Sequence, residues 1–419
     1  MYALDGQTLD PRDDSAQQAL ADAHGDNSRR PRCLCNPSED GGIPMYVARI
    51  GERYVIKRMP GSGPDHAADC PSWCPPPELS GLAPLLGTAI RDEPDSGTTT
   101  LGLGFALTHT RTRSGTSSSS SEPEHSSDAG IRLTLRSLLH YLWDEAGLTR
   151  WTPALAGKRY WGVVRSRLLS AVDGKTTKGR PLAEYLYIPE TFSSNHKSEI
   201  AVRRTAALQR LAGDDRIRKL MVLIGEVKTL TSTRFDRHAL VVKHLPDFPI
   251  LLTDDLTSRL RITSATEFAL GQAICDSHLI VILTFHLSPA GVAIAAEAAL
   301  MTMTSDWVPF ESINEHTLLT ALTEQRRRFT KSLRYTLPST TPIASAVLTD
   351  TDPPTACYLT DSHLPEPPER PALARWVWNT STDTNLPPLP AADPFTRQAS
   401  GSDRRRIGDP HRTEPQQPS

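Results

Sequence analysis

The sequence lacks the features that would mark a membrane, secreted or strongly basic protein. Its longest apolar runs, such as HLIVILTF (278–285), are far shorter than the roughly 20 residues of a membrane span. Its acidic start, MYALDGQTLDPRDDSAQ, contains no apolar core of a secretory signal. Lys plus Arg number 46 against 48 Asp plus Glu, so the whole chain has no excess of positive charge. We therefore expect a soluble, cytoplasmic protein without membrane attachment, in which any basic face is local.

The chain is also poor in apolar residues for its length. They make up 38% of the 419 residues, and 35 residues are proline. Such a chain is too long for one ordinary core, and part of it cannot bury enough apolar surface to order itself. Changes in composition predict five stretches: a disordered arm (1–30), a cysteine-rich module (31–107), a Ser-rich linker (108–130), a globular body (131–360) and a Pro-rich, mostly disordered tail (361–419).

Helical and strand-like patterns are mixed in the predicted body. Apolar residues from Leu135 to Trp143 recur at helical spacing, with Gly147 just beyond them as a stop signal. LMVLIGEV (220–227) is short and rich in branched residues, as strands are, whereas GVAIAAEAALMTM (291–303) fits either state. Because helices and strands do not alternate regularly, we predict an α+β fold: a small N-terminal module, a mixed α+β body and disordered tails.

Cysteine is concentrated near the start of the chain. Four of the six cysteines lie between residues 33 and 74, together with His66. Clustered Cys and His in a cytosolic protein favour a metal site over disulfides. MYVARI (45–50) and RYVIKR (53–58) flank Gly51-Glu52 and predict a β-hairpin. This hairpin would carry the chain out from the first cysteine pair and back toward the second half of the cluster.

The spacing of these residues predicts the ligands. Cys33 and Cys35 form a knuckle-like pair, and His66 and Cys70 are four residues apart, so one helical turn would place both on one face. Three thiolates and an imidazole satisfy a tetrahedral Zn²⁺ and leave no open position, which predicts a structural zinc site. The alternative is a set of unligated thiols. Cys74 is a spare candidate, ranked below Cys70 because three prolines follow it at once.

A basic stretch follows the first predicted helix of the body. Between residues 158 and 180, seven basic residues are opposed only by Asp173, and Tyr160 and Trp161 are interleaved with them. Two helices joined by a connection predict a unit like a helix-turn-helix, although the connection is longer than usual. The alternative is a solvated amphipathic helix with Trp161 packed inward. The residues predicted to contact DNA are Lys158, Arg159, Arg165 and Arg167.

A short acidic pattern raises the alternative of a metal-dependent nuclease. Glu226 and Lys228 end a strand-like run, and Asp215 lies upstream of them. An Asp followed by Glu-x-Lys can hold a divalent metal beside a lysine in nucleases of the restriction-endonuclease type. The expected upstream hairpin is not evident, since RRTAALQRLA (203–212) has a helical pattern. These three residues can equally be surface charges, and no catalytic residue is assigned.

The tail offers a third hypothesis, a protein-interaction factor. It is rich in proline, and ARWVWN (374–379) contains Trp376 and Trp378. These side chains could dock on a protein partner or fold back on the core.

Several segments, in this order, resemble a bacterial family, the domain of unknown function family eleven-seventy-three. They are CLC (33–35), HAADCPSW (66–73), LRSLLHYLWDEAGLTRWTPALAGKRYW (135–161), LYIPE (186–190), LIGEVK (223–228), DWVPF (306–310) and RRFTKSLRY (327–335). The family is described by three N-terminal cysteines, which the resemblance places at Cys33, Cys35 and Cys70. It implies no activity. Such proteins are similar to those carried on bacterial plasmids and integrated elements, which implies an accessory, DNA-associated factor of a mobile element.

Overall fold

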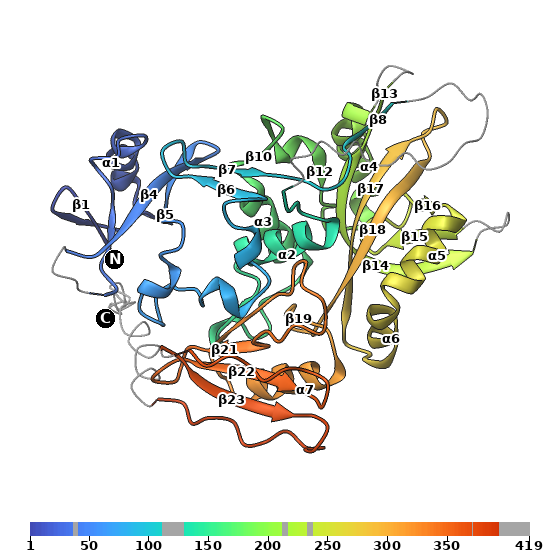
Figure 1. The fold of residues 1–419 in the computed structure, drawn as a ribbon. Helices are drawn as coiled ribbons and strands as arrows, with labels where there is room; N and C mark the ends of the chain where they lie inside the picture. Colours follow the sequence, from blue (N-terminus) through green and yellow to red (C-terminus); the bar gives the residue numbers. More distant parts are fainter. Residues whose placement is uncertain (37–40, 111–129, 212–216, 233–237, 371, 394–419) are drawn as a thin grey trace, which may run out of the picture.

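A computed structural model describes residues 1–36, 41–110, 130–211, 217–232, 238–370 and 372–393. Helices and strands are combined in mixed sheets, which confirms the predicted α+β fold class (Figure 1). The N-terminal sheet lies on one side of the molecule, the first long helices lie at its centre, and the C-terminal sheet lies below them in this view. None of the helices in the described ranges combines the length and apolar character that a membrane crossing requires.

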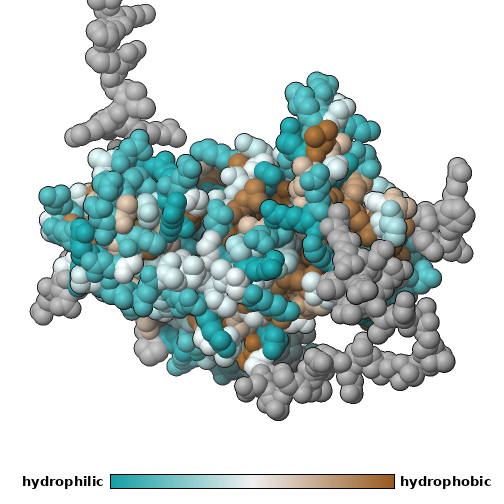
Figure 2. Space-filling view, turned by 90° about the horizontal axis from the view of Figure 1, so that it is seen from above, coloured by the Kyte–Doolittle hydropathy of each residue, from teal (hydrophilic) through white to brown (hydrophobic). Residues whose placement is uncertain are grey.

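The first sheet has the order β2-β1-β3-β4-β5. It is formed by β1 (Tyr2–Leu4), β2 (Gln7–Leu9), β3 (Arg32–Cys33), β4 (Ile43–Ile50) and β5 (Arg53–Arg58). β4 and β5 are the predicted hairpin, paired from Met45↔Arg58 to Ile50↔Arg53. In the space-filling view from above, the surface over this module is mostly hydrophilic (Figure 2).

The first 30 residues form regular structure, in contrast to the disordered arm that we predicted. Asp5 and Gly6 have φ angles of 49° and 77°, the conformation of a two-residue hairpin turn between β1 and β2. The helix α1 (Asp14–Ala23) then buries Leu20, which clusters with Leu4 and Val47. Pairing of β1 with β3 makes this arm part of the sheet that carries Cys33. The arm is ordered because its apolar face has a partner in a distant segment.

Two helices occupy the centre of the molecule. In α2 (Leu135–Glu145), the Thr134 hydroxyl accepts the N–H of Ser137, and the helix ends before Gly147, which has a φ of 65°. Its buried side chains form the largest core with those of α3 (Trp161–Val172). A four-stranded sheet covers this core: β6 (Ile90–Glu93), β7 (Thr98–Leu101), β10 (Lys175–Thr177) and β11 (Arg180–Pro181).

A seven-stranded sheet forms the other side of the body. The segment that fitted helix or strand is β18, which pairs with β17 from His278↔Met303 to Leu287↔Ala293. The strands are β12 (Leu186–Tyr187), β14 (Met221–Ser232), β15 (His238–Val242), β16 (Ile250–Leu252), β17 (His278–Leu287), β18 (Ala293–Met303) and β19 (Pro309–Phe310). Three helices accompany it: α4 (Lys197–Leu208), α5 (Asp254–Thr263) and α6 (Ala265–Ala273). A separate pair is β8 (Thr108–Thr110) with β13 (Ile217–Lys219).

The last sheet includes part of the tail that we predicted to be mostly disordered. Its strands are β9 (Arg150–Trp151), β20 (Phe329–Lys331), β21 (Ala346–Leu348), β22 (Thr355–Thr360) and β23 (Ala374–Asn379), and it packs with α7 (Ile313–Glu324). Trp378 on β23 is only 2% exposed, and its Nε1–H donates to the Asp383 carbonyl. Trp376 donates to the Pro388 carbonyl. Both tryptophans therefore fold back on this chain.

The cysteine-rich segment shares a core with this last sheet. Cys33, Cys70 and Trp73 cluster with Val347 and Tyr358 from β21 and β22. The predicted boundaries of the module at 31 and 107 therefore do not enclose a separate core. Most of the predicted Ser-rich linker (111–129) and the end of the tail (394–419) lie outside the described residues.

Candidate metal centre

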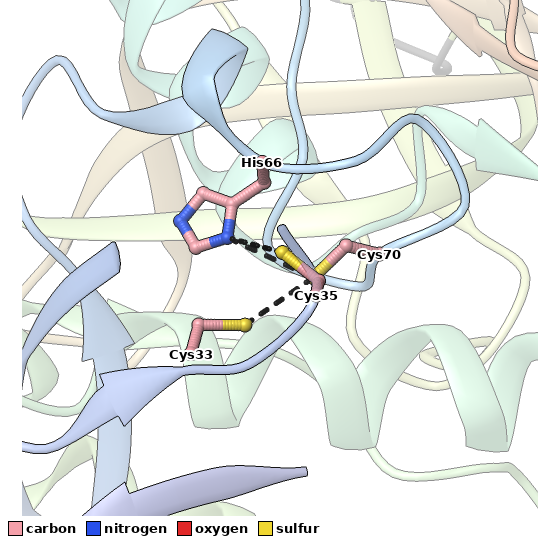
Figure 3. A group of neighbouring side chains, drawn as sticks. All are labelled: Cys33, Cys35, His66 and Cys70. Atoms are coloured by element: carbon pink, nitrogen blue, oxygen red, sulfur yellow. Dashed lines mark hydrogen bonds between the residues drawn. The ribbon is translucent and has the colours of Figure 1, made fainter. Parts of the chain in front are cut away.

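Four side chains from two distant segments converge at one point. The ligand atoms of Cys33, Cys35, His66 and Cys70 all lie within 4.8 Å of one another. The Sγ atoms of Cys33 and Cys70 are 3.7 Å apart, and His66 Nδ1 lies 3.3 Å from Cys35 Sγ and 3.8 Å from Cys70 Sγ (Figure 3). This is the group of side chains that we predicted from the spacing. Three sulfur atoms and one ring nitrogen suit a metal ion.

The first pair of ligands is positioned by main-chain pairing. Cys33 ends β3, where it pairs with Tyr2 on one side and Ile43 on the other. The next residue, Leu34, donates its N–H to the Met1 carbonyl. The chain then turns, so that Cys35 points to the same centre as Cys33. The arm that we expected to be disordered thus holds the strand on which the first ligand lies.

The second pair does not lie on an α-helical turn, which corrects our prediction. A short 3-10 helix, η1 (Gly63–Asp65), ends just before His66, and Cys70 closes a turn by donating its N–H to the Ala67 carbonyl. Pro71 directly follows Cys70, and a residue before proline is disfavoured in the helical conformation. The side chains of His66 and Cys70 still meet, because the turn between them brings both to the same side of the chain.

Burial keeps two thiols and the imidazole of this group uncharged. Burial raises the pKa of the Cys33 thiol to about 12, and it also raises the pKa of Cys70. Burial, with help from Arg58, lowers the pKa of His66, which keeps its imidazole neutral. Thiolates at this place therefore require a cation beside them, and a neutral imidazole can offer a lone pair. Four such ligands would complete a closed coordination shell.

Sequence reasoning missed a residue that supports this centre. Arg150 on β9 donates one N–H to the Pro71 carbonyl at 2.5 Å and another to the Trp73 carbonyl. The loop that contains Cys70 is therefore fastened to the body by one guanidinium. A sequence gives no signal for such a contact, because the acceptors are main-chain carbonyls.

Replacing Arg150 should loosen a metal ion held by these four side chains. A hydrogen bond from a charged group contributes about 1.5–3 kcal/mol. We expect Arg150→Met to release the metal to a chelator roughly tenfold faster or more, since about 1.4 kcal/mol corresponds to a factor of ten. Arg91→Met, at an exposed position of β6, is the matched control and should behave like the wild type. Equal release rates for the two variants would show that Arg150 does not support the centre.

The residues predicted to contact DNA differ in their accessibility. Lys158 and Arg167 are exposed, and Arg165 is half-buried with its Nε–H donated to the Ile188 carbonyl. Arg159 is only 8% exposed, and it donates to the carbonyls of Leu148, Arg150 and Asp306. It is thus a structural residue and not the surface cation that we predicted.

The connection between α2 and α3 also differs from a helix-turn-helix. It spans residues 146–160 and contains β9, which pairs with β20 in the last sheet. A helix-turn-helix joins its helices by a turn of three or four residues. The basic helix is therefore an element of the core with a basic outer face, and the predicted compact unit does not form.

The residues of the nuclease alternative are not gathered into a metal site. Glu226 is 5% exposed, and its Oε1 lies 2.9 Å from Lys243 Nζ and 2.8 Å from His278 Nδ1. Although burial opposes its charge, these hydrogen bonds keep the pKa of Glu226 below its usual value. Lys228 is exposed, and Asp215 lies outside the described residues. Among described side chains, the cysteine–histidine group is the one that meets the spacing of a metal site.

Comparison with known families agrees with the resemblance seen in the motifs. The family described as "Protein of unknown function (DUF1173)" matches residues 2–381 of the 419. This match includes all four side chains of the candidate metal centre and the whole basic helix. Comparisons with curated proteins and with solved structures found no match. The match spans most of the chain, and the chain therefore belongs to the DUF1173 family.

Proposed function

We propose that this chain is a zinc protein in which Cys33, Cys35, His66 and Cys70 hold a structural Zn²⁺. The convergence of these four ligand atoms is the observation that carries the proposal. We further propose that the zinc-stabilised protein is an accessory, DNA-associated factor of a bacterial mobile element.

The separations of the ligand atoms support zinc. With Zn–S bonds of about 2.3 Å, a tetrahedral ion holds two sulfur atoms about 3.8 Å apart. The Sγ atoms of Cys33 and Cys70 are 3.7 Å apart. With a Zn–N bond of about 2.0–2.1 Å, a sulfur and a nitrogen ligand are about 3.6 Å apart. The two separations at His66 Nδ1, 3.3 and 3.8 Å, bracket this value. Zinc also prefers a closed set of thiolate and imidazole ligands in structural sites.

The ion would have a structural role, because its ligands come from separate parts of the fold. Cys33 belongs to the first sheet, whereas Cys70 begins the loop that Arg150 fastens to the body. The same two cysteines contact the core of the last sheet. An ion bound here would tie these segments together, and with four protein ligands it would leave no position for a substrate.

The cations on and beside α3 support contact with nucleic acid. Arg167 on the helix is exposed, as are Lys158 before it and Lys178 and Arg180 after it, and Arg165 is half-buried. Contacts to phosphates need such accessible cations but no base-specific geometry. The chain as a whole is close to neutral, so binding would depend on this local group. The link to mobile elements rests on the resemblance described above.

A salt titration tests this part of the proposal. Affinity for duplex DNA should fall steeply with salt, with a slope that decreases by about 1 for each phosphate contact removed. We expect the combined substitutions Lys158→Gln, Arg165→Gln and Arg167→Gln to flatten the slope by about 2–3. Arg259→Gln, at an exposed position of α5, should leave it unchanged. No binding at low salt, or an unchanged slope in the triple variant, would refute DNA contact through this helix.

The other two functions have less support. A metal-dependent nuclease would need Glu226 as a metal ligand, and that carboxylate is engaged by Lys243 and His278. A protein-interaction scaffold based on Trp376 and Trp378 would need these side chains free, and both donate hydrogen bonds within the chain. Recruitment of a protein partner by the tail would depend on residues 394–419, which the structure does not describe.

A further inference from the structure

A cleft lies between the loop after Cys70 and the end of α2. It consists of a hollow of about 510 Å³ and a neighbouring one of about 260 Å³. The two hollows share five residues in their walls, namely Arg58, Pro71, Cys74, Asp144 and Glu145. The shared walls make them two parts of one cleft. Its size is that of sites for small molecules, which measure about 300–1,000 Å³.

The two carboxylates at the end of α2 already have partners. Glu145 accepts a hydrogen bond from Lys175 Nζ at 2.6 Å, and Asp144 accepts one from the Thr149 hydroxyl at 2.6 Å. The guanidinium of Arg58 differs from them. In the part of the chain that is described, it has neither a hydrogen bond nor an ion pair, although Glu145, Asp144 and Cys74 lie close enough to influence its pKa. Arg58 is therefore a donor in the wall of the cleft whose hydrogen bonds are not made by the described residues.

The wall of the smaller hollow also contains a second hydrogen-bond donor and apolar side chains. Lys57 lines it beside Arg58 and, like Arg58, has no hydrogen bond or ion pair to a described residue. Leu82, Leu86 and Tyr141 line the same hollow. The cleft thus presents two cationic donors next to apolar and aromatic surface.

We propose that this cleft binds a small molecule that carries a phosphate or carboxylate group, and that Arg58 recognises the oxyanion. A guanidinium offers N–H groups in a fork that matches the oxygens of either group. The apolar wall would take the rest of the molecule. A metal ion is a poorer occupant, because the acidic side chains of the cleft do not form a group of described residues with metal-ligand spacing. This inference goes beyond the proposed function and does not depend on the identity of the metal or on DNA binding.

Three ring compounds of matched size test the class of ligand. Phenyl phosphate and benzoate carry the two oxyanions, and benzyl alcohol carries neither. We expect at least one of the two anions to bind the full-length protein tenfold more tightly than the alcohol, measured by titration calorimetry. A preference for phenyl phosphate would identify a phosphate ligand, and a preference for benzoate a carboxylate ligand. If neither anion binds better than the alcohol, the proposal is wrong.

Substitutions on one strand test the role of Arg58. Arg58→Gln should weaken binding of the preferred anion at least tenfold, while Arg58→Lys, which keeps the charge and loses the fork, should weaken it less. Arg53→Gln, at the exposed start of the same strand, should bind like the wild type. Equal affinities for Arg58→Gln and Arg53→Gln would overturn the assignment.

Labelling of Cys74 locates the ligand without any substitution. Cys74 lines both hollows, whereas Cys275 is exposed elsewhere. A saturating concentration of the preferred anion should slow alkylation of Cys74 by iodoacetamide several-fold and leave Cys275 unaffected, as read by mass spectrometry. An unchanged rate at Cys74 would place the ligand outside the cleft and would contradict the proposal.

Discussion

Loss of the metal should unfold the segments that supply its ligands. Apparent binding energies of structural zinc are on the order of 10 kcal/mol, which is enough to decide whether a small region folds. Cys70→Ser removes a buried sulfur ligand and should reduce the bound metal from one ion per chain to well below one. Hydrogen exchange in residues 63–74 should then become faster, because without the ion this loop is held by Arg150 and by the packing of Trp73.

Cys74→Ser is the matched control for this experiment. It makes the same change four residues away, at a thiol that is not part of the ligand group. We expect this variant to keep its metal and the exchange rates of the wild type. If Cys70→Ser also kept its metal, the coordination that we assign would be wrong. Loss of metal from Cys74→Ser would instead make Cys74 a ligand.

Removing the carboxylate of Asp350 should lower the free energy of unfolding more than breaking an ion pair on the surface. Its Oδ1 and Oδ2 accept hydrogen bonds from both Nη2 and Nε of Arg327 at 2.8 and 2.9 Å. Oδ2 also accepts the Arg328 N–H at 2.9 Å. Both charged side chains are buried, with 5% and 7% exposed. Asp350→Ala would leave the Arg327 cation buried without its partner, and breaking such a pair costs about 3–5 kcal/mol.

An exposed pair supplies the comparison for Asp350. Asp255 and Arg259 are also 2.9 Å apart, on the surface of α5. Asp255→Ala should change the free energy of unfolding by less than about 1 kcal/mol. Urea denaturation of both variants measures the difference. Equal losses would mean that burial does not determine the strength of the Asp350 interaction.

The convergence of the four candidate ligands could be predicted because cysteine is scarce and its clustering is conspicuous. The local geometry could not be predicted equally well. We expected a helical turn from His66 to Cys70, although Pro71 after Cys70 argues against it. The prediction that His66 and Cys70 converge was still correct, because the turn, like a helical turn, places residues four apart on the same side of the chain.

The strands of the N-terminal arm were missed because they are short. β1 and β2 are three residues each, too short for an alternating pattern to stand out. The signal was the pair Asp5-Gly6, which is typical of a hairpin turn. Pairing with β3 could not be read from the sequence, because it depends on residues thirty positions away.

Two arginines show a different limit. Arg159 belongs to the predicted basic stretch and Arg150 lies outside it, and both bind main-chain carbonyls in the structure. Every residue has a main-chain carbonyl, so no pattern of side chains in the sequence predicts such a contact. A cation in a basic run can therefore be a structural residue, and only its burial distinguishes the two roles.

X-ray absorption at the zinc edge, combined with elemental analysis of the purified protein, tests the central claim most directly. We expect one zinc ion per chain, with three sulfur ligands at about 2.3 Å and one nitrogen ligand at about 2.0–2.1 Å. A protein without metal, or an ion surrounded mainly by oxygen, would contradict a centre formed by Cys33, Cys35, His66 and Cys70.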